Sequence, residues 1–173
     1  VGLGDVNGDG YSDLAVGADE YDGAGTDSGA VFVWHGGAAG LGANGTPANA
    51  DWQGSSSFSN TDYGHAVAAG DFNGDGFADL AIGANIHSNV ELNEGALFAY
   101  FGSAAGLGAN GTAANADWIA ESNLAGAELG QSLAGGDFNG DGYSDLAAGA
   151  PMYTNGQTNE GQVRLYLGGA YGP

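Results

Sequence analysis

A nine-residue acidic segment occurs three times in this chain, and its copies follow one another at equal intervals. The copies read DVNGDGYSD at 5–13, DFNGDGFAD at 71–79 and DFNGDGYSD at 137–145. Each copy gathers three Asp and one Asn, and like charges this close repel strongly unless a cation neutralises them. The 173 residues include a single Lys or Arg. The sequence therefore predicts about three bound metal ions, one per copy.

The 66-residue period extends well beyond the acidic segment. Residues 41–106 and 107–172 are identical at 34 of 66 positions, with no insertion between them. The chain therefore divides into a partial first unit, 1–40, and two further units, 41–106 and 107–173, or about 2.6 repeats. We interpret the three units as one continuous repeat domain.

The sequence of each unit predicts four short β-strands. In the second unit they cover 63–71 before the acidic segment, 79–84 after it and 95–102, with a weaker strand around ADW at 50–52. The blocks are too short for helices and are bounded by Gly, Asn and Asp. Short strands in a repeat of this length are typical of propeller blades. The predicted fold class is all-β, with β-propeller blades of four antiparallel strands; a β-solenoid, whose rungs are usually shorter, is the alternative.

Oxygen-bearing groups occupy alternate positions of the first acidic segment. Asp5, Asn7, Asp9 and Asp13 stand at positions 1, 3, 5 and 9, and Tyr11 at position 7 can offer its backbone carbonyl. Five or six hard oxygens without nitrogen or sulfur describe a Ca²⁺ site, because Mg²⁺ requires tighter octahedral geometry and more water. Position 12 is apolar in every copy, so the segment is not an EF-hand loop. We expect it to join two strands in a hairpin that the ion stabilises.

The composition excludes two classes of partner. There are 21 acidic residues against one basic residue, which gives a formal net charge of −20. Such a chain cannot neutralise nucleic-acid phosphates, and anionic membrane surfaces repel it. No apolar run is long enough for a membrane-spanning helix. With 43% hydrophobic residues the chain is not expected to be disordered, and without cysteine it has no disulfides or thiolate metal sites.

The order of these motifs resembles a known family. A Tyr-Gly or Leu-Gly pair at 63–64 and 129–130 precedes the first strand, the acidic loop and DLA follow, and Gly-Ala-Pro is complete at 149–151. This order is similar to the FG-GAP repeat of integrin α-subunit β-propellers and their bacterial relatives, and the resemblance covers the whole chain. It implies Ca²⁺ in the hairpin loop between the first two strands of each blade. The ligands that it implies are Asp5, Asn7, Asp9, the Tyr11 carbonyl, Asp13, Asp71, Asn73, Asp75, the Phe77 carbonyl, Asp79, Asp137, Asn139, Asp141, the Tyr143 carbonyl and Asp145.

The resemblance implies a ring that this chain alone cannot close. Propellers of the family usually have about seven blades, whereas this chain begins inside the first strand of one blade and stops after the third strand of another. Open sheet edges invite pairing. We expect either that the chain is a piece of a longer propeller or that it assembles with copies of itself in a ring or an open stack.

Several repeated side chains fit packing or turn roles. Trp52 and Trp118 share one register, which favours packing between blades over sugar stacking. Glu94 and Glu160 also align, and each is either a turn-stabilising carboxylate or a rim ligand for a partner. The three histidines occupy three different repeat positions and no cysteine accompanies them, so a histidine metal site is not expected.

The sequence contains two glycosylation sequons and no recognisable catalytic set. Asn44 and Asn110 begin N-G-T sequons at equivalent positions, although N-G is also a common turn. The sequence contains no nucleophile elbow, no Cys–His pair and no phosphate loop, and calcium explains the clustered Asp residues. We therefore do not expect an enzyme.

The expected function is that of a secreted, extracellular calcium-binding module for adhesion, binding or self-assembly, in which Ca²⁺ rigidifies the loops between strands. Its partners would be other copies of itself or the rest of a longer propeller, with a protein or glycan as ligand. Three alternatives stay open: a structural subunit of an extracellular fibre or surface layer, a calcium-dependent carbohydrate-binding lectin, and an accessory domain of a secreted hydrolase.

Overall fold

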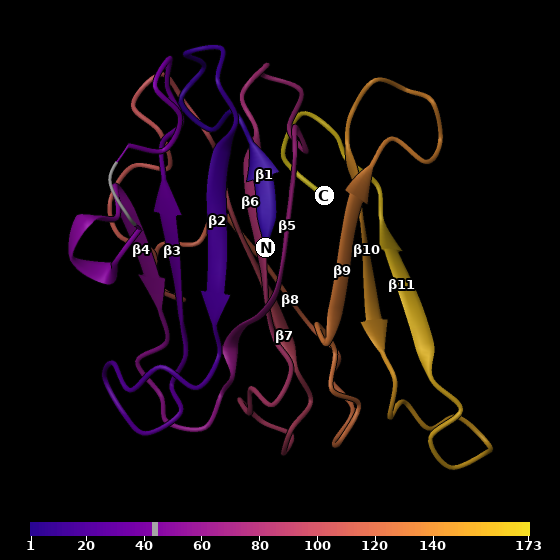
Figure 1. Cartoon of the computed structure of the whole chain (residues 1–173). Coiled ribbons are helices and arrows are strands. Elements are labelled where there is room, and N and C mark those ends of the chain that lie inside the picture. Colours follow the sequence, from indigo (N-terminus) through magenta and orange to yellow (C-terminus); the bar gives the residue numbers. More distant parts are fainter. Residues whose placement is uncertain (43–44) are drawn as a thin grey trace.

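The regular elements of the chain are almost entirely β-strands. A computed structural model describes residues 1–42 and 45–173 (Figure 1). Within these ranges the one helical element is the 3₁₀ turn η1 (Pro47–Asn49). The strands are β1 (Gly2–Gly4), β2 (Asp13–Ala18), β3 (Ala30–Trp34), β4 (Trp52–Ser55), β5 (Tyr63–Gly70), β6 (Asp79–Ala84), β7 (Ala96–Tyr100), β8 (Trp118–Glu121), β9 (Ser132–Gly136), β10 (Asp145–Ala150) and β11 (Gln162–Tyr166). The all-β prediction is confirmed.

The strands form three antiparallel sheets. Their orders are β1-β2-β3-β4, β5-β6-β7-β8 and β9-β10-β11, so each strand pairs with the next one along the chain. The sheets lie side by side in chain order, and β5 of the middle sheet contacts β2 on one side and β9 on the other (Figure 1). Three sheets in a row do not close a ring. The arrangement is that of propeller blades in an open series, as the sequence predicted.

The sheets do not begin where the repeat units were divided. They span residues 2–55, 63–121 and 132–166, whereas the units were divided at 40/41 and 106/107. The Trp-containing strand opens the second unit, but β4 pairs with β3 and so completes the first sheet. An internal repeat fixes the period of a structure but not the position at which one structural unit ends and the next begins.

The two larger parts of the hydrophobic core lie one on each face of the middle sheet, and a smaller third cluster surrounds Phe32 and Trp34 in the first sheet. Successive residues of a strand point to opposite faces. Phe98 therefore packs with Val31 and Trp52 toward the first sheet, whereas its neighbour Leu97 packs with Leu146 toward the third sheet. Because both faces are covered, every residue of β6 and β7 is buried. This explains why these strands, apart from Asp79 at the start of β6, do not alternate between apolar and polar residues.

The repeated tryptophans belong to the packing between and within these clusters. Trp52 is 2% exposed and meets the Tyr100 ring edge-on, with 5.1 Å between ring centroids. Trp118 makes the equivalent contact with Tyr166 at 5.0 Å. The Trp52 indole N–H also donates to the carbonyl of Ala109, 2.9 Å away. The structure therefore places these side chains in the packing role.

Candidate metal centre

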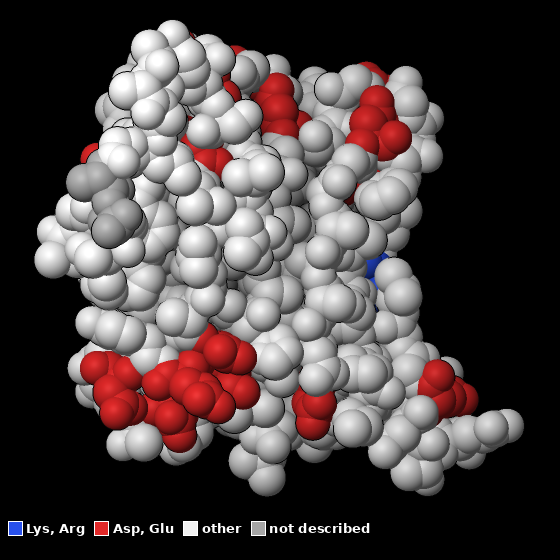
Figure 2. All heavy atoms as spheres, in the orientation of Figure 1, with Lys and Arg blue, Asp and Glu red and all other residues white. Residues whose placement is uncertain are grey.

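The three acidic loops occupy the same place in each sheet. They join β1 to β2, β5 to β6 and β9 to β10, and all three lie at the upper end of the sheets in Figure 1. Acidic side chains appear at this end in the space-filling view (Figure 2). The sequence prediction that each loop connects two strands directly is thus met at every copy.

The first Asp of each loop organises the turn around its carboxylate. Asp5 accepts hydrogen bonds from the backbone N–H groups of Gly8, Asp9 and Gly10 at 2.7, 3.1 and 2.9 Å. The same three bonds recur at Asp71 and Asp137. At Asp137 these amides, with Gly142 the strongest contributor, lower the pKa of the carboxyl group. The third loop therefore favours an ionised carboxylate at position 1.

The side chains at positions 3 and 5 lie against each other. The Asn7 amide oxygen accepts from the backbone N–H of Asp9 at 3.0 Å, and its nitrogen is 3.5 Å from an Asp9 carboxylate oxygen. The corresponding nitrogen–carboxylate distances are 3.0 Å in the second loop and 2.8 Å in the third. Glycines with positive φ flank position 5 in all three loops, and only glycine adopts this backbone conformation without strain.

The last Asp of each loop has a second partner that the sequence did not reveal. Asp13 is buried, and its two carboxylate oxygens accept from the backbone N–H groups of Val6 and Gly36, each at 2.8 Å. Asp79 makes the same bridge to Phe72 and Gly102, and Asp145 to Phe138 and Gly168. The bridge ties the start of the loop to the end of the third strand. The one sequence signal was a Gly that follows this Asp at the same interval in every copy.

Neighbouring loops are in contact through position 7. A Cβ added to Gly8 would meet the Phe77 ring of the next loop, and a Cβ on Gly74 would meet the Tyr143 ring. The backbones are also joined, since the Ala78 N–H donates to the Asp5 carbonyl at 2.9 Å. Phe77 and Tyr143, whose backbone carbonyls are predicted calcium ligands, thus also connect one loop to the next through their rings.

The oxygen donors of these loops are of the chemical kinds that a calcium ion prefers. All donors are carboxylate, amide or backbone oxygens, as Ca²⁺ prefers. Within the described ranges, no three acidic or histidine side chains converge closely enough to form a cage by themselves. Burial raises the pKa of Asp79 to about 7, although hydrogen bonds from the backbone N–H groups of Gly102, Phe72 and Asn73 act in the opposite direction. A nearby cation would favour the charged form of this carboxyl group.

A second acidic cluster lies at the opposite end of the first sheet. Figure 2 shows it at the lower left, over the loops that follow β2 and β4. Asp62 lies here, and burial followed by repulsion from Asp19 raises the pKa of its carboxyl group. His65 contacts Asp19 at 2.9 Å. The sequence did not single out this cluster, because Asp62 is distant in sequence from Asp19, Glu20 and Asp27.

The remaining predicted residues are placed as follows. Glu94 is fully buried, and its carboxylate accepts from the backbone N–H groups of Asn89, Val90 and Asn123, so it stabilises turns. Glu160 is exposed. Asn110 is exposed, and its side-chain oxygen accepts from the Gln53 N–H at 3.2 Å, while Asn44 lies outside the described residues. No helix in the described ranges is long and apolar enough to cross a membrane.

Comparison with known proteins identifies the repeats. The sequence profile of the FG-GAP repeat matches residues 1–34, 63–94 and 129–166, which make up more than half of the chain. Each matched segment contains one acidic loop and the strands on either side of it. Each of the three sheets thus contains the strands of one matched segment.

Several curated relatives share these repeats. Human phosphatidylinositol-glycan-specific phospholipase D is 33% identical over 178 residues, which is 95% of this chain and 20% of that protein. The bovine protein of the same name is 34% identical over 173 residues, with 96% and 20% covered. Integrin alpha-4 of Xenopus laevis is 36% identical over 107 residues, which is 61% of this chain and 10% of the integrin. The chain spans a fifth or less of the length of these relatives.

Proposed function

The chain belongs to the FG-GAP repeat family, and on this premise we propose that it is an extracellular calcium-binding module of propeller type that serves adhesion or ligand binding rather than catalysis. The observation that carries the proposal is the threefold repetition of one acidic loop at the same end of the sheets. All three loops share the same hydrogen bonds around the first Asp.

Each loop would hold its ion with its own oxygens. The candidates are the carboxylates at positions 1, 5 and 9, the amide at position 3 and the carbonyl at position 7. A bound Ca²⁺ supplies positive charge at this point, and three ions would change the formal net charge from −20 to −14 (−20 + 3 × 2). The chain's own contribution is to hold the loop backbone with the first and last Asp. The ions would thereby rigidify the connected row of loops.

A calcium titration by calorimetry tests this proposal. We expect about three sites per chain, with dissociation constants of roughly 10⁻⁴–10⁻³ M, as in extracellular modules. Asp75→Asn, at the exposed position 5 of the middle loop, should remove one site. Asp22→Asn removes the same charge outside the loops and should leave three. Equal stoichiometry in both variants, or no binding to the unaltered chain, would contradict the proposal.

Adhesion or ligand binding is proposed from the similarity to integrin α-subunits. The chain is similar to Xenopus laevis integrin alpha-4 and also to Drosophila melanogaster integrin alpha-PS2, with 34% identity over 116 residues. The similarity to phospholipase D proteins is not taken to imply hydrolysis, because it covers only a fifth of them and the sequence offers no recognisable catalytic set. If the source cell glycosylates secreted proteins, Asn44 and Asn110 are the proposed glycan sites.

Assembly with further blades is the second function that a specific observation favours. The outer face of the third sheet is apolar and uncovered, and Val163 and Leu165 are 74% and 50% exposed on it. We propose that other copies of the chain or further units of a longer propeller cover this face, as in a ring, fibre or layer. Particle mass with and without Ca²⁺ tests self-assembly. No comparable observation favours a lectin, since Trp52 is packed in the core.

A further inference from the structure

Adjacent acidic loops are joined by backbone hydrogen bonds in addition to their aromatic contacts. The Ala78 N–H in the second loop donates to the Asp5 carbonyl in the first loop at 2.9 Å. The Ser144 N–H in the third loop donates in the same way to the Asp71 carbonyl in the second loop, at 2.8 Å. The same bond therefore forms at both junctions between loops.

The peptide group that makes this bond belongs to two loops at once. Its N–H is that of the residue after position 7, so its carbonyl is that of Phe77 or Tyr143, a predicted calcium ligand. Because a peptide group is planar and trans, its C=O and N–H point in opposite directions. A cation at the carbonyl oxygen polarises the group and makes its N–H a stronger donor. Occupation of one loop should therefore strengthen the bond that holds the preceding loop.

A second connection runs through the last Asp of each loop. The Gly102 N–H donates to Asp79 at 2.9 Å, and the N–H of the next residue, Ser103, donates to the Val6 carbonyl at 3.1 Å. The Val6 N–H in turn donates to Asp13 at 2.8 Å. A continuous series of backbone and carboxylate groups thus connects the last Asp of the second loop with the last Asp of the first.

The junction between the second and third loops repeats this series. The Gly168 N–H donates to Asp145 at 2.8 Å. The next residue, Gly169, donates to the Phe72 carbonyl at 3.0 Å, and the Phe72 N–H donates to Asp79 at 2.8 Å. Asp79 therefore takes part in both junctions, which places the second loop between the other two.

Glycine is required where the third strand meets two loops. A Cβ on Gly102 would overlap the carbonyl of Ala78 in the second loop and crowd that of Val6 in the first. A Cβ on Gly168 would meet the third and second loops in the same way. The nearest atoms to a Cβ on the equivalent Gly36 all belong to the first loop. The loops are therefore in close backbone contact at both junctions, and the first loop has no neighbour on its other side in the described ranges.

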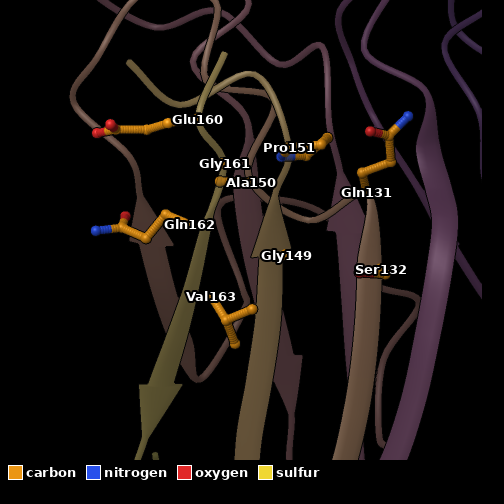
Figure 3. A pocket seen from close by; sticks show the side chains of 9 residues that line it. All are labelled: Gln131, Ser132, Gly149, Ala150, Pro151, Glu160, Gly161, Gln162 and Val163. Carbon is orange, nitrogen blue, oxygen red and sulfur yellow. The ribbon is translucent and has the colours of Figure 1, made fainter. Parts of the chain in front are cut away.

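The third loop likewise has a neighbour on one side only. In the described part of the chain no further sheet follows the third one, and Val163 lines an open groove of about 470 Å³ on its outer face (Figure 3). A Cβ on Gly140 meets nothing within 4 Å. The row thus consists of two outer loops and a middle loop that is joined to both.

We propose that adjacent acidic loops bind calcium with positive cooperativity, which these shared backbone groups transmit, whereas the first and third loops bind independently of each other. This inference rests on the proposed calcium binding and adds how the sites influence one another. Coupling between two sites is reciprocal, so each loop gains affinity when its neighbour is occupied. Direct repulsion between two bound cations has the opposite effect and lowers the affinity of the second site. Positive cooperativity therefore reports the contacts between loops.

Removing one site at a time tests the proposal. Asp9→Asn, Asp75→Asn and Asp141→Asn make the same change at the exposed position 5 of the first, second and third loops. Each variant should bind two ions, so the three are matched in substitution, charge and stoichiometry. The two outer variants retain an adjacent pair of loops, whereas Asp75→Asn retains the separated first and third loops. Calorimetry measures calcium binding, and circular dichroism in chelator confirms that each variant is folded.

We expect Hill coefficients of about 1.3–1.5 in both outer variants, as a coupling of about threefold to tenfold gives for two sites. Asp75→Asn should show a Hill coefficient of about 1 and require about two to three times more Ca²⁺ for half-saturation. The unaltered chain, which needs no substitution, should also bind cooperatively. A Hill coefficient of 1 or less in the unaltered chain, or equal coefficients in all three variants, would overturn the proposal and leave calcium binding intact. No binding to any of the proteins would overturn both.

Discussion

At the scale of single residues, the carboxylates of each acidic loop have different environments. Asp9 is exposed and bonds only within its own turn, through the N–H of Tyr11. Asp13 is buried and holds two backbone N–H groups that are distant from each other in sequence, those of Val6 and Gly36. A buried N–H without an acceptor costs far more than an exposed one. The last Asp therefore supports the fold even when no ion is bound.

The first prediction separates this structural role from calcium binding. In the presence of a chelator, Asp13→Ala should lower the free energy of unfolding by about 2–4 kcal/mol, because two amides lose their acceptor. Asp9→Ala should change it by less than about 1 kcal/mol, as an exposed substitution usually does. Urea unfolding measures both variants. Similar losses in the two would mean that Asp13 does not carry the bridge.

The second prediction concerns alkaline pH. The Tyr63 and Tyr100 hydroxyls are 2.9 Å apart. Burial raises the pKa of Tyr100 to about 12 and that of Tyr63 well above its ordinary value. The unfolded chain ionises these phenols near pH 10, so their stabilising contribution is present below pH 10 and is lost as pH rises toward 12. Tyr63→Phe removes one of these two ionisations. The slope of the unfolding free energy against pH should therefore decrease by the equivalent of about one proton. An unchanged slope would contradict this.

At the scale of elements, the acidic loops form a connected row. The ring of Phe77 lies over Gly8, and the ring of Tyr143 lies over Gly74, whereas a Cβ on the equivalent Gly140 would meet nothing within 4 Å. The third loop thus offers a natural comparison. It has the same turn and the same backbone conformation, without a ring packed over it.

The third prediction uses this comparison. Gly74→Ala and Gly140→Ala place a Cβ at φ angles of 75° and 78°, so both incur a similar strain of about 1 kcal/mol. Gly74→Ala must also displace the Tyr143 ring, and it should cost about 1–2 kcal/mol more. Urea unfolding in chelator gives the difference. Equal costs would show that contact between the second and third loops contributes nothing to stability.

Local patterns in the sequence predicted these elements well, but not the contacts between them. The strand after the acidic loop was expected at 79–84 and is found at Asp79–Ala84, because DLAIGA is a short apolar run bounded by turn residues. The bond from Gly102 to Asp79 was not predictable, since nothing local relates two residues so distant in sequence. The Tyr143 ring on Gly74 spans a full repeat and depends on how neighbouring sheets are offset.

At the scale of the whole molecule, the chain is a row of sheets with acidic side chains at both ends (Figure 2). The middle sheet is buried on both faces, and the third is covered on one face only. Arg164, the one basic side chain of the sequence, donates to the carbonyls of Glu121 and Ser122 at 3.0 and 2.9 Å and so joins the third sheet to the second. The net charge of −20 has almost no internal compensation. Bound cations would reduce this repulsion.

The measurement that tests calcium stabilisation most directly is the melting temperature of the unaltered chain in 10 mM Ca²⁺, in 10 mM Mg²⁺ and in chelator. If three sites bind with dissociation constants near 1 mM, calcium should stabilise the fold by about 4 kcal/mol, or about 1.4 kcal/mol per site. For a chain of this size that raises the melting temperature by roughly 10 °C, with a smaller rise in Mg²⁺. The same melting temperature in Ca²⁺ and in chelator would contradict the proposal that the loops bind calcium.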